Sequence, residues 1–258
     1  MPGSGKSTLI SALVAEFRGR GKTIAVAAID PSSPFSGGAV LADRCRMSRH
    51  QGDSGVYIRS LSARGCVGGL SAGTGRVVEV LKAAAFDLVL IESVGAGQSE
   101  VDIRDIAKVC VVVCTPNSGD DVQAIKSGIL EIADILVVNK SDLADAGRAV
   151  QQLTEAQNLP SNAWRRVPVL PTVATDASGI AVLADRILEQ IDTTDGAPGN
   201  RNHTNRIRRR LVRAISQKLE QRLLDSDDEY LVKLCTRVLR GQQSFEDAAA
   251  AWVADKKL

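Results

Sequence analysis

Five short apolar runs, separated by stretches with helical periodicity, limit this 258-residue chain to an α/β fold. Several runs are nearly continuous in apolar residues, as expected for strands covered on both faces, and this favours a parallel sheet wrapped by helices. We predict strands at Thr23–Ile29, Asp87–Glu92, Val109–Cys114, Ile135–Asn139 and Val167–Val173. We predict helices at Ser7–Arg18, Val77–Ala85, Asp121–Ala133, Asp142–Ala156 and Ile180–Ile191.

The character of the sequence changes near residue 193. Residues 193–203 have no apolar period and are rich in Gly, Asn and Thr, which indicates a linker. Beyond it, apolar residues recur every four positions along one helix face, at Ile207, Leu211, Ile215, Leu219 and Leu223. Leu231, Leu234 and Val238 begin a second helix, and Phe245–Val253 predicts a third. We expect an α/β domain at 1–192, a linker at 193–203, and a helical arm at 204–258 for self-association or partner docking.

Composition narrows the function classes. A net charge of +2 implies no strong attraction to nucleic acid or membrane, and no apolar run of 18 or more residues occurs. The arginines at 208–210 could bind nucleic acid, but the solvated face of a helix is favoured because no aromatic residues are interleaved. Cys110 and Cys114 lie in an apolar run and favour buried thiols over metal ligands or bridges. A reducing, cytoplasmic setting is expected.

The first eight residues, MPGSGKST, contain most of a phosphate-binding loop. They end the pattern G-x-x-x-x-G-K-[ST], whose first glycine would precede Met1 by one position. Gly3 and Gly5 let backbone N–H groups turn toward phosphate oxygens, Lys6 would reach the β/γ-phosphates, and the Ser7 hydroxyl would ligate Mg²⁺. A flexible Gly/Ser terminus before an amphipathic helix is the alternative. We assign nucleotide contacts to Gly3, Ser4, Gly5, Lys6, Ser7 and Thr8.

A carboxylate at a strand end is the second part of such a site. Glu92 ends a predicted strand and begins an acid-x-x-Gly arrangement, so it would hold Mg²⁺ directly or through water while the Gly95 N–H contacts the γ-phosphate. An ordinary strand-ending carboxylate before a turn is the alternative. Asp30 is a second acid at the carboxyl edge of the sheet, where ligands bind in such folds. Asp43 could be a third, although its spacing alone favours a surface carboxylate.

The residue that follows Gly95 is Ala96, whereas a small GTPase has there the glutamine that orients the attacking water. We therefore expect slow intrinsic hydrolysis, or hydrolysis that depends on a partner or on another residue. Gln98 and Glu100 are candidates for that residue, and we assign Gln98, together with Lys6, Glu92 and Gly95, to the catalytic set.

Base selection is encoded in Asn139-Lys140-Ser141-Asp142, the N-K-x-D arrangement. The Asp142 carboxylate can accept from the N1–H and the 2-amino group of guanine, and adenine offers neither donor there. Lys140 would lie over the base with its aliphatic stem. The alternative is a strand-to-helix turn in which Asp142 caps the next helix. A backbone N–H near Val173 and Ala174 would contact guanine O6.

Taken together, the motifs PGSGKST, DPSSPFSGG, LADRCRM, IESVGAGQSE and VNKSD resemble the methylmalonyl-CoA mutase-associated GTPases, the MeaB/ArgK type, over about Met1–Ile191. The resemblance implies a P-loop GTPase three-layer sandwich with a mostly parallel sheet, and a C-terminal helical arm. It implies that Asp30, Asp43 and Glu92 surround Mg²⁺ beside Ser7, with GTP or GDP as the nucleotide, and that residues 118–126 form a switch that signals to the mutase.

In that family, GTP hydrolysis gates adenosylcobalamin loading and protects a cobalamin-dependent acyl-CoA mutase, and the cobalamin belongs to the mutase. The resemblance therefore implies a GTP-hydrolysing chaperone that forms a homodimer through its C-terminal helices. The family also carries an N-terminal helical segment, a first strand and a first P-loop glycine before the position of Met1. We expect this chain to bind GTP more weakly than a version extended by that strand and glycine. Alternative readings are a kinase that phosphorylates a transport-system protein, or a truncated product with little nucleotide binding.

Overall fold

A computed structural model describes residues 3–30, 48–50, 52–62, 72–93, 103–104, 106–116, 132–158, 166–195, 201–224 and 228–255. The chain divides into two compact units, Met1–Arg201 and Asn202–Leu258. In the described part of the chain, no helix is both long enough and apolar enough to span a bilayer.

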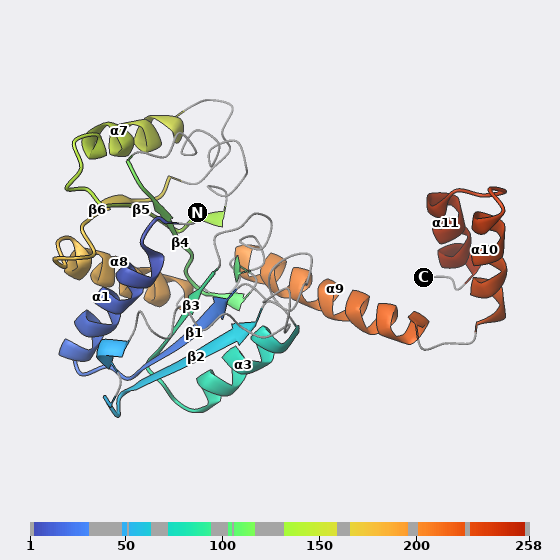
Figure 1. Ribbon diagram of the computed structural model, residues 1–258, viewed down its shortest axis with the longest axis horizontal. Coiled ribbons are helices and arrows are strands. Elements are labelled where there is room, and N and C mark those ends of the chain that lie inside the picture. The colour runs from blue at the N-terminus through green and yellow to red at the C-terminus, as the bar shows by residue number, and fades with distance from the viewer. Residues whose placement is uncertain are drawn as a thin grey trace. The chain divides into compact units, whose positions relative to one another are not determined.

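The described residues of the first unit form two three-stranded parallel sheets (Figure 1). One sheet has the order β2-β1-β3, and the other has the order β4-β5-β6. The first sheet contains β1 (Ile24–Asp30), β2 (Val56–Ser62) and β3 (Leu88–Glu92). The second contains β4 (Val111–Cys114), β5 (Ile135–Asn139) and β6 (Val169–Thr172). Every pairing between these strands is parallel, which confirms the α/β class predicted from the apolar runs.

Helices cover both faces of these sheets and give three layers. On one face, α1 (Lys6–Gly19) and α8 (Ile180–Asp195) share a single apolar core with both sheets. On the other face, α3 (Ala72–Ala83) packs on the first sheet and α7 (Ala146–Ala156) packs on the second. Successive strand residues point to opposite faces, so the larger β1 side chains Ile24 and Val26 join the α1 core. The small alanines between and after them face α3.

The five predicted strands are present with slightly different ends, but β2 is a sixth that the sequence analysis missed. It lacks a continuous apolar run because Arg59 and Ser60 interrupt it, as is common in an edge strand. Helix α7 also begins at Ala146 and not at Asp142, because residues 140–145 form turns. The predicted helix at Asp121–Ala133 lies mostly outside the described residues.

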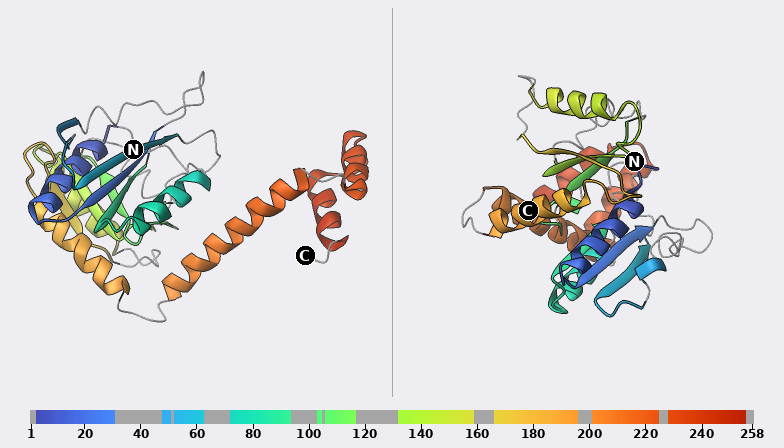
Figure 2. Two further views of the ribbon diagram at one scale, coloured as in Figure 1. Left: turned by 90° about the horizontal axis from the view of Figure 1, so that it is seen from below. Right: turned by 90° about the vertical axis from the view of Figure 1, so that its left-hand side faces the viewer.

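The described residues of the second unit form three helices, the first of which begins one residue before the unit: α9 (Arg201–Leu224), α10 (Glu229–Leu239) and α11 (Phe245–Asp255). Its core is formed by Leu234, Ala248 and Trp252, and α10 lies beside α11 (Figure 2). The Asp228 carboxylate caps α10 by accepting from the Tyr230 N–H at 2.9 Å. The expected linker at 193–203 is helical at both ends, because the helix-breaking Gly and Pro residues all fall within 196–200.

Candidate functional site

The glycine-rich loop leads directly into the amino end of α1. Gly3 and Gly5 adopt left-handed conformations, with φ of 78° and 81°, which a residue with a Cβ rarely adopts. Gly5 is the N-cap of α1 and provides no side-chain cap, and the first turn of the helix carries no acid. The helix therefore presents backbone N–H groups and the positive end of its dipole, which suits an anion such as phosphate.

Ser7 and Glu92 connect this loop to the first sheet. The Ser7 hydroxyl donates to Glu92 Oε1 at 2.6 Å, and both residues are buried, at 6% and 4% exposed. Ser7 comes from the first turn of α1, and Glu92 is the last residue of β3. A hydroxyl and a carboxylate are oxygen donors of the kind that Mg²⁺ prefers, so this pair fits a hard divalent cation.

Asn139 connects the same loop to the second sheet. Its side chain is 2% exposed and donates from Nδ2 to the Ser4 carbonyl oxygen at 3.0 Å. Its Oδ1 accepts from the Ala174 N–H at 3.1 Å and from the Thr172 hydroxyl at 3.3 Å. One buried amide thus fixes the glycine-rich loop, the end of β5 and the loop after β6 together.

The turn after β5 adds two further contacts. Lys140 has a φ of 59°, and its Nζ donates to the Gly3 carbonyl oxygen at 3.0 Å. The Ser141 hydroxyl donates to the Thr172 carbonyl oxygen at 2.7 Å. Asp142 follows in this turn with an exposed side chain. The N-cap of α7 is Asp145, so the alternative in which Asp142 caps that helix is wrong.

The loop after β6 holds the two residues that we expected to contact guanine O6. The Val173 N–H donates to the Ser178 carbonyl oxygen at 3.0 Å, and the Ala174 N–H donates to Asn139. A contact from either group to O6 would therefore have to share or replace an existing hydrogen bond.

The structure describes only some of the remaining expected site residues. Lys6 is half-buried in the first turn of α1, and Thr8, two residues later, is exposed. Asp30 ends β1, but its side chain is not among those described, and Asp43, Gly95 and Gln98 lie outside the described residues. The expected switch at 118–126 also lies outside them.

The sequence analysis missed the roles of Thr172 and Ser141. Thr172 is the last residue of β6, and its hydroxyl donates to Asn139 while its carbonyl accepts from the Ser141 hydroxyl. The loop that follows it also contacts Asn139, through the Ala174 N–H. The signal available in the sequence was a small hydroxyl residue at the variable position of N-K-x-D and another at the end of a neighbouring strand. Neither signal identifies its partner, because the partner belongs to a distant segment.

Comparison with known proteins places this geometry in a family. The family described as methylmalonyl Co-A mutase-associated GTPase MeaB matches residues 1–228. A Pyrococcus abyssi protein named "Putative GTPase" is 50% identical over 192 residues, which are 73% of this chain and 59% of that protein. The Caenorhabditis elegans protein named methylmalonic aciduria type A homolog, mitochondrial, is 35% identical over 74% of this chain and 50% of its own length. The chain thus spans about half to three fifths of these relatives.

Solved structures give the same fold. The crystal structure of a LAO/AO transport system kinase matches with a TM-score of 0.67 and 23% identity, over 100% of this chain and 80% of that one. The hydrogenase maturation factor HypB from Archaeoglobus fulgidus matches with a TM-score of 0.50 and 25% identity, over 73% of this chain and 85% of that one. These likenesses, together with the parallel sheets, confirm the predicted P-loop α/β fold.

Proposed function

The chain belongs to the family of methylmalonyl Co-A mutase-associated GTPases, and on this basis we propose that it binds guanine nucleotide and hydrolyses GTP to GDP and phosphate. The observation that supports this most is the Asn139 side chain, which joins the phosphate-binding loop at Ser4 to the two segments expected to hold the base. One nucleotide can contact a base-binding motif and a phosphate-binding motif together only when the two motifs lie in one site.

We assign the roles within this site as follows. The Gly3–Ser7 backbone and the Lys6 ammonium hold the phosphates at the amino end of α1. Ser7 and Glu92 hold Mg²⁺, which would neutralise charge on the phosphate oxygens, and Asp30 and Asp43 complete its surroundings. The Gly95 N–H contacts the γ-phosphate, and Gln98 is the candidate for orienting the attacking water. Because the position after Gly95 lacks a glutamine, hydrolysis without a partner is slow.

Asp142 is proposed to select guanine, and its exposed carboxylate provides the sharpest test of the site. The Asp142→Asn variant keeps the size of the side chain but loses one acceptor and the charge. Since hydrogen bonds to a charged group contribute about 1.5–3 kcal/mol, we expect GTP affinity to fall at least ~10-fold. Affinity for ATP should stay low in both proteins.

Asp145→Asn is the matched control, because Asp145 is also an exposed aspartate in the same turn and makes no side-chain cap. It should leave GTP affinity unchanged. Displacement of a fluorescent GDP analogue measures all three proteins. Equal binding of ATP and GTP by the parent chain would contradict the proposal.

We further propose that the chain serves a cobalamin-dependent acyl-CoA mutase as a chaperone in the cytoplasm. The mutase as partner is supported by the family description and by the name of the Caenorhabditis elegans relative, whereas the cytoplasmic location rests on the sequence alone. Purified mutase should be retained on the immobilised chain, with different affinities in GTP and in GDP. A transport-protein kinase is the competing activity, and transfer of the labelled γ-phosphate of GTP to a protein acceptor would favour it.

Self-association is assigned to the second unit. Leu211, Val212 and Ile215 are 55–59% exposed on α9, so an apolar strip of this helix faces solvent within its own unit. Leu211→Glu with Ile215→Glu should convert a homodimer into a monomer in light scattering. Val182→Glu on α8 is the control, because Val182 is similarly exposed in the first unit. A monomeric parent chain would refute this assignment.

A further inference from the structure

Two hydrogen bonds join Ser141 to the end of β6. The Ser141 N–H donates to the Thr172 carbonyl oxygen at 3.0 Å, and the Ser141 hydroxyl donates to the same oxygen at 2.7 Å. Thr172 is buried, and it pairs with Asn139 in the ladder between β5 and β6. One residue of the turn after β5 is therefore held twice by the end of the neighbouring strand.

The strand end that provides this carbonyl is closely packed. The Thr172 hydroxyl donates to Asn139 Oδ1 at 3.3 Å. Gly179 lies against the same strand end, and a Cβ at Gly179 would overlap the Pro171 carbonyl oxygen and lie 3.4 Å from Thr172 Cα. The Thr172 carbonyl therefore has little room to follow the turn after β5 if that turn moves.

Asp142, the residue after Ser141, depends on the backbone for its direction. Its side chain is exposed, and among the described residues its carboxylate makes no hydrogen bond or ion pair. The turn continues with a local bond from the Leu143 N–H to the Lys140 carbonyl oxygen at 3.1 Å. In the described part of the chain, the anchor closest to Asp142 that reaches another strand is thus the pair of bonds from Ser141.

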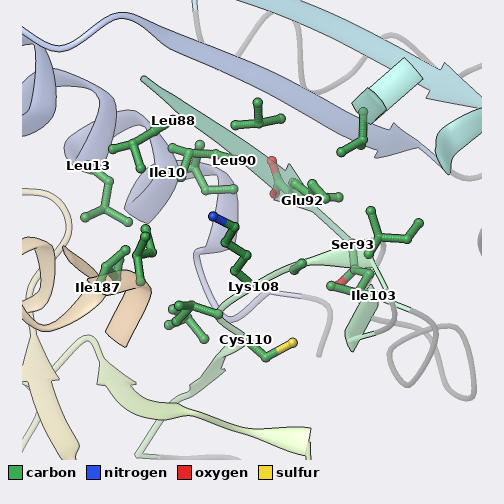
Figure 3. Close-up of a pocket in the computed structure, with 18 of the residues that line it drawn as sticks. Ile10, Leu13, Leu88, Leu90, Glu92, Ser93, Ile103, Lys108, Cys110 and Ile187 are labelled. Atoms are coloured by element: carbon green, nitrogen blue, oxygen red, sulfur yellow. The ribbon is translucent and has the colours of Figure 1, made fainter. Parts of the chain in front are cut away.

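Recognition of guanine by a carboxylate requires an accurately placed backbone. The two Asp142 oxygens would accept from N1–H and from the 2-amino group, and such bonds need N···O distances of about 2.7–3.2 Å. A small shift of the turn would lengthen both bonds at once. The phosphate side is held separately, because Glu92 at the end of β3 contacts Ser7 (Figure 3). A change at Ser141 can therefore affect the base and spare the phosphates.

We propose that Ser141 is a positioning residue that determines base specificity. By donating twice to the Thr172 carbonyl, it aims the Asp142 carboxylate at guanine, and it does not contact the nucleotide itself. This inference rests on the proposed function, since it takes Asp142 as the group that contacts the base. It gives the variable position of N-K-x-D a role that needs a hydroxyl, because an alanine there would keep only the backbone bond.

GDP and inosine diphosphate are the probes for the test, because they differ only in the 2-amino group of the base. Displacement of a fluorescent GDP analogue from the full chain gives both affinities. We expect the parent chain to prefer GDP at least ~10-fold. Ser141→Ala should reduce this preference at least ~3-fold, whereas a merely structural role would weaken both nucleotides alike.

The two ways of failing can be distinguished. If the parent chain prefers GDP and Ser141→Ala keeps the full preference, the role of Ser141 is wrong and the proposed function stands. If the parent chain binds the two nucleotides equally, the role of Asp142 in the proposed function is contradicted, and the role of Ser141 with it.

A double-mutant cycle tests whether Ser141 acts through Asp142. In the parent chain, Ser141→Ala should weaken GDP binding at least ~5-fold. In Asp142→Asn, where the contact to the base is already weakened, the same change should alter GDP affinity by less than ~2-fold. Equal factors in the two backgrounds would show that Ser141 acts independently of Asp142 and would overturn the proposal.

Two serine variants serve as controls. Ser178 is an exposed residue of the loop after β6, and its hydroxyl makes no hydrogen bond within the part of the chain that the structure describes. Ser178→Ala should therefore keep the parent preference. Ser141→Thr retains the hydroxyl and should keep the preference within ~2-fold of the parent. Circular dichroism checks that each variant folds, and a folded Ser141→Thr that behaves as Ser141→Ala does would count against the hydroxyl.

Hydrogen exchange gives a readout that needs no nucleotide. The Leu143 amide donates to the Lys140 carbonyl oxygen within the turn that Ser141 anchors. Its exchange should become faster in Ser141→Ala and stay unchanged in Ser141→Thr. Unchanged exchange in Ser141→Ala would show that the hydroxyl does not hold the turn.

Discussion

Removal of the Asn139 side chain should destabilise the first unit more than any other single change at the end of β5. In Asn139→Ala, the Ser4 carbonyl and the Ala174 N–H both lose the hydrogen bond that they make to this amide in a buried site. Loss of a hydrogen bond at a buried polar group costs about 1–3 kcal/mol, so two such losses give about 2–6 kcal/mol. The Thr172 hydroxyl can rotate to another acceptor, so it adds little. Because water can enter the space left by the amide, we expect a loss of about 2–4 kcal/mol.

Urea unfolding followed by circular dichroism measures this loss. With a slope of about 1–3 kcal/mol per molar urea, the midpoint should fall by roughly 1 M or more. Thr172→Val is the control, since it removes only the 3.3 Å contact and should cost about 1 kcal/mol or less. Asn139→Asp should not rescue stability, because it keeps the acceptor but turns an oxygen toward the Ser4 carbonyl.

The location of the effect can be checked by hydrogen exchange of the Leu9 amide, which donates to the Gly5 carbonyl in the first turn of α1. Asn139→Ala should speed this exchange, and Thr172→Val should not. A loss below ~0.5 kcal/mol for Asn139→Ala, or equal losses for the two variants, would refute the reasoning that the amide holds the loop.

Three further outcomes are expected. Gly5→Ala should weaken nucleotide binding and stability more than Gly3→Ala: both positions have positive φ, but only a Cβ at Gly5 meets another atom, 2.6 Å away on Asn139. Fluorescent GDP binding and urea unfolding compare the two variants, and equal effects would contradict the contact. The Arg18 hydrogen bond holds the pKa of Asp53 below its ordinary value of 3.8, so the stability from this carboxylate is present above that pH and is lost as pH falls through the lowered pKa. In Asp53→Asn the urea midpoint should therefore fall less steeply as the pH is lowered below that value. An unchanged dependence of the midpoint on acid pH would rule this out. Leu234→Ala should cost about 2–5 kcal/mol in the second unit, read from tryptophan fluorescence, and a smaller loss would show that Leu234 is not central to that core.

The sequence was most informative where one segment determines its own structure. The all-apolar runs predicted five strands because a parallel strand covered on both faces needs such a run. The strand at Val56–Ser62 was missed because Arg59 and Ser60 give it the composition of an exposed edge. The start of α7 was placed too early because Lys140 takes a positive φ, and a local propensity argument does not anticipate this.

The candidate site was less accessible from the sequence than the strands were. Ser7, Glu92 and Asn139 could be identified as candidates because each lies in a short motif of neighbouring residues, and the motifs follow in the expected order. The bond from Asn139 to Ser4 joins residues 135 positions apart, and its existence depends on how two sheets meet. For the same reason, the hydrogen bonds of the Ser141 and Thr172 hydroxyls could not be predicted from the sequence, because they depend on how the fold brings distant segments together.

The glycine-rich loop is a junction between the sheets as well as a phosphate site. Ser7 ties it to the end of β3, and Ser4 ties it to the end of β5. A nucleotide on the loop would therefore bind a segment that both sheets already hold in place, so part of the cost of ordering the loop is met before the nucleotide arrives.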